Sequence, residues 1–88
     1  MTSIRITAQS PSIFLVSVAD QTGQTTHEVT VHPSDLERYA PDATPEELIE
    51  ASFEFLLARE PKESILARFE LPVIERYLPE YADVMRSR

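Results

Sequence analysis

Apolar and polar residues alternate along the first third of the chain, and this two-residue period is typical of β-strands. Residues 4–8 and 25–31 follow the alternation, whereas residues 13–19 are rich in β-branched and aromatic side chains. Turn-forming residues separate the three segments, and we expect Gly23, the only glycine, to supply a positive φ in a hairpin loop. The pattern predicts a three-stranded antiparallel meander with residues 13–19 in its centre.

The predicted central strand is apolar on both of its faces. A sheet with one wet face should show polar residues in one of the two rows. We therefore expect helices on one face and a second copy or a partner on the other, unless the sheet curls around its own core. Ile13 and Leu15 are candidate partner-binding residues on this basis. The two rows are Phe14, Val16 and Val18, and Ile13, Leu15 and Ala19.

The hydrophobic period changes to that of helices after residue 32, and prolines divide this part of the chain into short segments. Proline is tolerated in the first turn of a helix, where its missing N–H is not needed. The spacing predicts helices over residues 33–39, 45–59, 61–69 and 72–78, and a last one that begins at Pro79 or is kinked by it.

The clearest helix start lies at Thr44, with Glu47 three positions later completing a capping box. The helix that follows has a broad apolar stripe, which implies contacts on more than one side. The predicted fold class is α+β: an antiparallel sheet over residues 4–31, packed against short helices over residues 33–86. At 88 residues the chain is read as one domain, 1–88, whose modest core self-association would extend.

Charge narrows the range of partners. The formal net charge is −7, and residues 32–60 contain eight acidic and two basic side chains. Such a chain is repelled by nucleic acid and by anionic membranes, so the expected partner is a basic protein. Glu46, Glu50 and Glu54 form a row at helical spacing and are candidate contact residues, although a solvated helix face would show the same row.

Catalytic, metal and cofactor sites are not expected. The chain has no cysteine, and one glycine cannot build a phosphate-cradling loop. His27 and His32 are five positions apart on a strand, so they should point to opposite faces and act as ordinary surface histidines. No apolar run is long enough to span a bilayer, and no secretory signal is visible. These features predict a cytoplasmic protein that is not an enzyme.

The main hypothesis is therefore a protein–protein interaction module that forms a homodimer. Tyr77 and Tyr81, one helical turn apart if Pro79 only kinks the helix, are candidate interface anchors. One alternative is a DNA-associated regulator in which residues 64–78 form a degenerate helix-turn-helix, although the segment is not basic. A further alternative is a small-ligand-binding domain.

The last third of the chain resembles a group of small uncharacterised bacterial α+β proteins. The resemblance implies a bacterial, self-standing domain and no particular activity. The residues that carry it are Leu56-Leu57-Ala58-Arg59-Glu60-Pro61-Lys62-Glu63-Ser64-Ile65-Leu66, Phe69-Glu70-Leu71-Pro72-Val73-Ile74 and Tyr77-Leu78-Pro79-Glu80-Tyr81.

Overall fold

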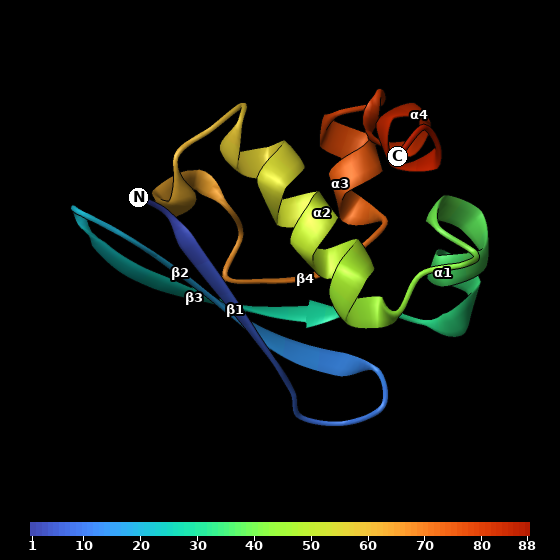
Figure 1. The fold of residues 1–88 in the computed structure, drawn as a ribbon, viewed down its shortest axis with the longest axis horizontal. Helices are drawn as coiled ribbons and strands as arrows, with labels where there is room; N and C mark the ends of the chain where they lie inside the picture. The colour runs from blue at the N-terminus through green and yellow to red at the C-terminus, as the bar shows by residue number, and fades with distance from the viewer.

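The computed structural model describes residues 1–88 and shows one sheet beneath a layer of helices (Figure 1). The strand order is β1-β2-β3-β4; the first three strands form antiparallel pairs, and β4 runs parallel to β3. The α+β class and the predicted meander are confirmed, and a fourth strand is added to them. The strands are β1 (Ser3–Ala8), β2 (Ile13–Asp20), β3 (Gly23–Thr30) and β4 (Arg68–Glu70).

The helices all lie on the same side of the sheet (Figure 1). They are α1 (Pro33–Tyr39), α2 (Pro45–Leu57), α3 (Val73–Tyr77) and α4 (Tyr81–Arg86). The predicted capping box is present at the start of α2. The Thr44 hydroxyl accepts a hydrogen bond from the Glu47 amide at 3.1 Å, and the Glu47 carboxylate accepts one from the Thr44 amide at 2.9 Å.

The β2–β3 hairpin is closed by Gly23, whose φ of 140° confirms the predicted positive value. A residue with a Cβ atom would be strained in this conformation. The hairpin turn is held by the Asp20 carboxylate, which accepts hydrogen bonds from the amide and the hydroxyl of Thr22. The loop geometry therefore depends on one aspartate and one glycine.

The predicted helix over residues 61–69 is wrong. Only Lys62–Ser64 forms a short 3₁₀ turn, and the chain then extends into β4. The free edge of β3 accounts for the difference, since the Glu28 amide donates to the Ala67 carbonyl at 2.8 Å and the Leu71 amide donates to the Thr30 carbonyl at 3.0 Å. Tertiary pairing has overridden the local helical preference of this segment.

Helical spacing does not continue across Pro79, so of the two alternatives the separate last helix is the one found, and Tyr77 and Tyr81 do not share a helix. α3 ends at Tyr77, and Leu78 leaves the helical region (φ −132°, ψ 83°), which a following proline disfavours. The chain turns before α4 begins at Tyr81. As a result Tyr77 is exposed, whereas Tyr81 is fully buried.

The core lies between the sheet and the helix layer. β2 contributes Phe14, Val16 and Val18, which face the helices. Phe53 of α2 is fully buried among them, and its ring lies 6.2 Å from that of Phe69 in β4. The short β4 thus adds an aromatic side chain to the core as well as closing the edge of β3.

Candidate functional site

The outer face of the sheet carries no helix, but it is less apolar than β2 alone suggested. Ile13 and Leu15 lie on this face and are half-buried. Leu15 is flanked by Thr7 of β1 and Glu28 of β3, and Glu28 forms an ion pair with Arg68 at 3.2 Å. Ser17 of β2 and the neighbouring strands thus supply polar groups on this face. The expected second copy or partner on this face stays a prediction.

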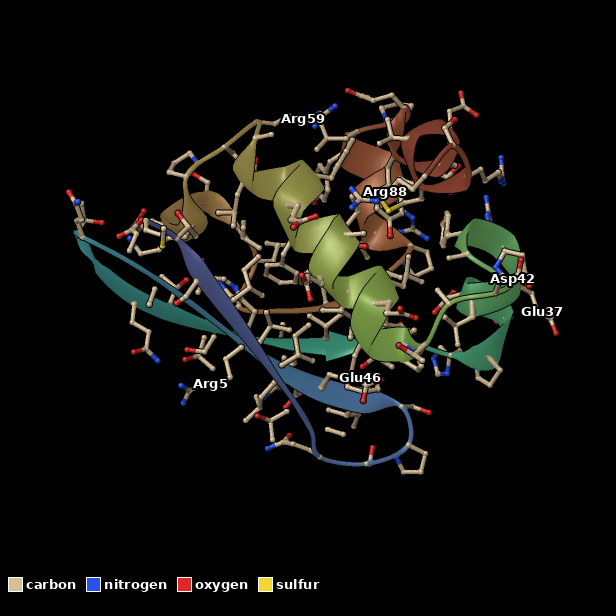
Figure 2. All side chains as sticks on the ribbon, in the orientation of Figure 1. Arg5, Glu37, Asp42, Glu46, Arg59 and Arg88 are labelled. Atoms are coloured by element: carbon tan, nitrogen blue, oxygen red, sulfur yellow. The ribbon has the colours of Figure 1, made fainter.

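The edge of the sheet that β1 forms is open. One side of β1 pairs with β2, and no strand lies on its other side. Its register with β2 is continuous over six residue pairs, without a bulge or an internal proline. Ile4 and Ile6 face the helix layer yet stay half-buried, because nothing lies beyond them. Arg5 points away from the helices (Figure 2).

The acidic row on α2 is exposed, as predicted, and its charge is partly neutralised. Glu54 forms an ion pair with Arg88 at 3.1 Å, whereas Glu46 and Glu50 make no ion pair. Glu50 and Glu54 line a hollow of about 850 Å³ between the α1–α2 loop and the end of the chain. Arg88 lines the same hollow (Figure 2), so its surface carries both signs of charge.

Two of the three tyrosines are buried, and their hydroxyl groups form hydrogen bonds inside the protein. The Tyr39 hydroxyl donates a hydrogen bond to Glu75 at 2.7 Å, and burial together with that carboxylate raises the pKa of Tyr39 to about 12. Tyr81 is bonded to the Ser52 hydroxyl at 2.6 Å, and burial raises its pKa further. Tyr81 is therefore inaccessible to a partner, and of the two predicted anchors only Tyr77 reaches the surface.

The two histidines are not both surface residues. His27 is buried, and its Nδ1 donates a hydrogen bond to the Leu66 carbonyl at 2.8 Å. Its Nε2 lies 2.8 Å from the Thr25 hydroxyl, so both ring nitrogens have a hydrogen-bond partner. His32 is exposed at the start of α1 and lies 3.2 Å from Glu70. No group of three or more metal-ligating side chains forms around either of them.

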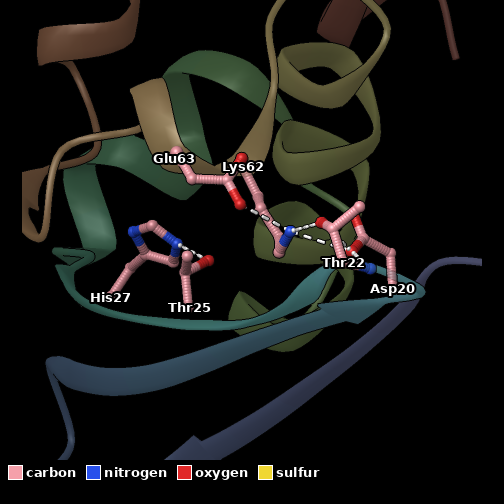
Figure 3. A network of polar contacts seen from close by, with 6 residues as sticks. All are labelled: Asp20, Thr22, Thr25, His27, Lys62 and Glu63. Atoms are coloured by element: carbon pink, nitrogen blue, oxygen red, sulfur yellow. Dashed lines mark hydrogen bonds and ion pairs between the residues drawn. The ribbon is translucent and has the colours of Figure 1, made fainter.

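A buried lysine, which sequence reasoning missed, ties the hairpin to the chain that follows α2 (Figure 3). Lys62 is 2% exposed, and its ammonium group donates to Asp20 at 2.8 Å, Thr22 at 2.6 Å and Glu63 at 2.6 Å. All three of its protons have an acceptor. The bond from Lys62 is the main reason why the pKa of Asp20 lies far below its ordinary value. This ammonium group therefore has a structural role.

An apolar groove lies between α3 and the loop before β4, and it also escaped the sequence reasoning. It has a volume of about 360 Å³, and eight of its ten lining residues are hydrophobic. Leu66 and Tyr77 line it and are 47% and 72% exposed; apart from Met1, they are the only exposed large hydrophobic residues. The signal available in the sequence was Tyr77, one of the two candidate interface anchors.

The helical hairpin expected at residues 64–78 is absent. This segment contains β4 and the short helix α3, so it does not form the two helices that the DNA-binding alternative requires. Of its two arginines, Arg68 is paired with Glu28 on the outer sheet face, and Arg76 lies on α3. Arg86 and Arg88 lie elsewhere, and Arg88 is paired with Glu54. The basic surface that this alternative needs is therefore dispersed.

Comparison with known proteins found no matching family model, no matching curated protein and no matching solved structure. No helix in the structure combines the length and the apolar character needed to cross a bilayer. The functional argument therefore rests on the surfaces described above.

Proposed function

We propose that this protein is a protein–protein interaction module that forms a homodimer through the open edge of its sheet. In the dimer, β1 of one copy pairs antiparallel with β1 of the other. The observation that carries the proposal is the unprotected state of β1. Natural sheets protect such edges with bulges, prolines, inward-pointing charges or other charged side chains; β1 has no bulge, no proline and no inward-pointing charge, and Arg5 is its single charged residue.

Apolar surface at the edge supports the same pairing. Ile4 and Ile6 are half-buried on the helix side, and α2 packs beside them. A fully buried isoleucine side chain is worth about 1.5–3 kcal/mol. A second β1 would cover the exposed parts of these side chains in both copies. The outer face offers less, because Ile13 and Leu15 are surrounded by polar groups.

The charge on β1 favours one register of the two strands. If both helix layers lie on the same side, the two-fold axis passes beside either Arg5 or Ile6. The first arrangement places Arg5 opposite Arg5 of the second copy, which is repulsive. The second places Ile6 opposite Ile6 and Arg5 opposite Thr7. We therefore propose the Ile6-centred register.

Two substitutions at Thr7 test this arrangement by sedimentation velocity. Thr7→Lys places a second positive charge opposite Arg5 and should weaken the dimer, whereas Thr7→Glu creates an ion pair there and should strengthen it. General repulsion between the copies would change in the opposite way. The chain already has a net charge of −7, so Thr7→Lys reduces this repulsion and Thr7→Glu increases it. Thr26→Lys is the control for a dimer that forms through the outer faces of the two sheets instead, since Thr26 is an exposed residue of β3. A monomeric wild type at high micromolar concentration would contradict the proposal.

The acidic side chains that have no ion pair supply a second part of the proposal, a basic protein partner. Glu46 and Glu50 are exposed on the edge of α2 and have no counterion within the chain. In a pull-down, Glu46→Lys together with Glu50→Lys should remove such a partner, and unchanged capture would contradict this part.

A further inference from the structure

The apolar groove between α3 and the loop before β4 has the composition of a binding site. Ligand sites are typically concave, about 300–1,000 Å³ in volume, mostly apolar, and supplied with a few polar groups that orient the ligand. This groove, at about 360 Å³, lies at the small end of that range. Its size suits one or two apolar side chains of a bound segment better than a whole helix.

The exposed hydrophobic residues of the protein concentrate at this groove. Leu66 and Tyr77 border it, while Phe69 and Ile74 form its buried lining. Single exposed hydrophobic residues are common on proteins, but two beside one apolar hollow mark an interaction surface. Tyrosine is also among the residues that most often dominate binding energy at interfaces. Tyr77 is therefore placed to act as the anchor.

One charged residue lines the groove, and it lacks a counterion. Glu60 is half-buried and takes part in none of the ion pairs of the chain. The two neighbouring basic side chains already have other partners. Arg59 is paired with Glu80 and lies over the Phe55 ring, and Lys62 is held by Asp20 and Glu63. An incoming positive charge would be the first partner of this carboxylate.

We infer that the groove binds a short amphipathic segment of another protein, whose apolar side chains fill the hollow and whose lysine or arginine pairs with Glu60. A second copy of this chain is a poor occupant, since apart from Met1 its exposed large hydrophobic residues are the two that line the groove itself. The groove lies at the β4 side of the sheet and β1 forms the opposite edge. Binding here is therefore independent of the proposed dimer.

The test is an NMR titration of the ¹⁵N-labelled protein with a short amphipathic peptide built of leucine and lysine. Saturable shifts should appear at the amides around Leu66, Phe69 and Tyr77. Tyr77→Ser should weaken binding roughly tenfold, which corresponds to about 1.4 kcal/mol. Glu60→Gln should weaken it severalfold, and a matched peptide with glutamate in place of lysine should bind more weakly than the lysine peptide.

The controls separate this site from general attraction to an acidic protein. Glu37→Gln removes a charge of the same kind from exposed α1, outside the surfaces proposed for binding, and should leave the affinity unchanged. Thr7→Lys should leave it unchanged as well, so the groove and the dimer can fail separately. If Tyr77→Ser does not fold, Leu66→Ser takes its place. Shifts centred on Glu46 and Glu50, equal binding of the two peptides, or full affinity in the serine variant would each overturn the proposal.

Discussion

The ammonium group of Lys62 donates a hydrogen bond to the Asp20 carboxylate at 2.8 Å, although the two residues stand 42 positions apart. The same ammonium binds Thr22 and Glu63. This contact fastens the tip of the β2–β3 hairpin to the segment that leads from α2 to β4. The position of the groove-lining loop that follows therefore depends on a hairpin at the other end of the sequence.

This contact predicts a particular dependence of stability on pH. The pKa values of Asp20 and Glu63 lie below their ordinary values of 3.8 and 4.5 because Lys62 donates to both. The stability that they contribute is therefore present above the unfolded pKa values and is lost as the pH falls below about 4. Asp20→Asn should be less stable than the wild type at neutral pH, as measured by urea unfolding.

The steepness with which stability falls at acid pH distinguishes the loss of the Lys62 contact from a general loss of packing. Between about pH 5 and pH 2, the free energy of unfolding of Asp20→Asn should fall less steeply than that of the wild type. Arg68→Met breaks an exposed ion pair and should cost no more than about 1 kcal/mol at neutral pH. If the free energy of unfolding fell equally steeply with pH in Asp20→Asn and in the wild type, the Lys62 contact would not be the cause of the pH dependence.

The bond between Ser52 and Tyr81 predicts an asymmetric pair of variants. Ser52 donates its proton to the Leu48 carbonyl at 2.7 Å, so the Tyr81 hydroxyl is the donor in the 2.6 Å bond between them. Tyr81→Phe removes that donor and should cost about 0.5–1.5 kcal/mol. Ser52→Ala leaves a buried hydroxyl without an acceptor and should cost about 1–3 kcal/mol. A larger loss in Tyr81→Phe, measured by chemical denaturation, would refute this assignment of donor and acceptor.

The buried His27 predicts a proton on Nδ1. A carbonyl oxygen can only accept, so the Nδ1 that faces Leu66 must be the donor. Long-range ¹H–¹⁵N NMR spectra should show a protonated Nδ1 for His27. The exposed His32 serves as the internal comparison. Spectra with an unprotonated Nδ1 in His27 would mean that the ring does not anchor the loop before β4.

Phe53 is the side chain on which the packing of α2 against the sheet most depends. Its ring is fully buried between those of His27, at 5.5 Å, and Phe69, at 6.2 Å. Phe53→Ala should cost about 3–5 kcal/mol, much of the stability of a small domain. Leu57→Ala, at a partly buried position on the same helix, is the comparison and should cost less. Equal losses in thermal or urea unfolding would place the centre of the core elsewhere.

Local signals in the sequence were sufficient for most of the regular elements. The period-two segments became β1 to β3, and the Thr44 capping box marked the start of α2. These features depend on residues that are close in the sequence. The same reasoning failed for β4, because Leu66, Ala67 and Arg68 are good helix formers that instead pair with a strand about 40 positions earlier.

The candidate sites were harder to predict, because each depends on non-local contacts. Lys62 was expected within a helix over residues 61–69, and its burial requires acceptors from the β2–β3 hairpin. Tyr81 was expected at the surface, and the break at Leu78 turned it into the core. The outer sheet face is less apolar than β2 alone suggested, since polar residues of β1 and β3 complete it. Of the candidate residues, Tyr77 alone reaches the groove proposed here.

The most direct test of edge pairing is hydrogen–deuterium exchange at the β1 amides, compared between dilute and concentrated protein. Edge pairing predicts that outward-facing amides of Ser3–Ala8 exchange more slowly at high concentration, while the amides of Ser10 and Ser12, whose hydrogen bonds lie within the β1–β2 turn, do not change. Exchange in β1 that is independent of concentration, in a protein that sediments as a dimer, would contradict pairing through this edge. It would direct attention to the outer face around Leu15.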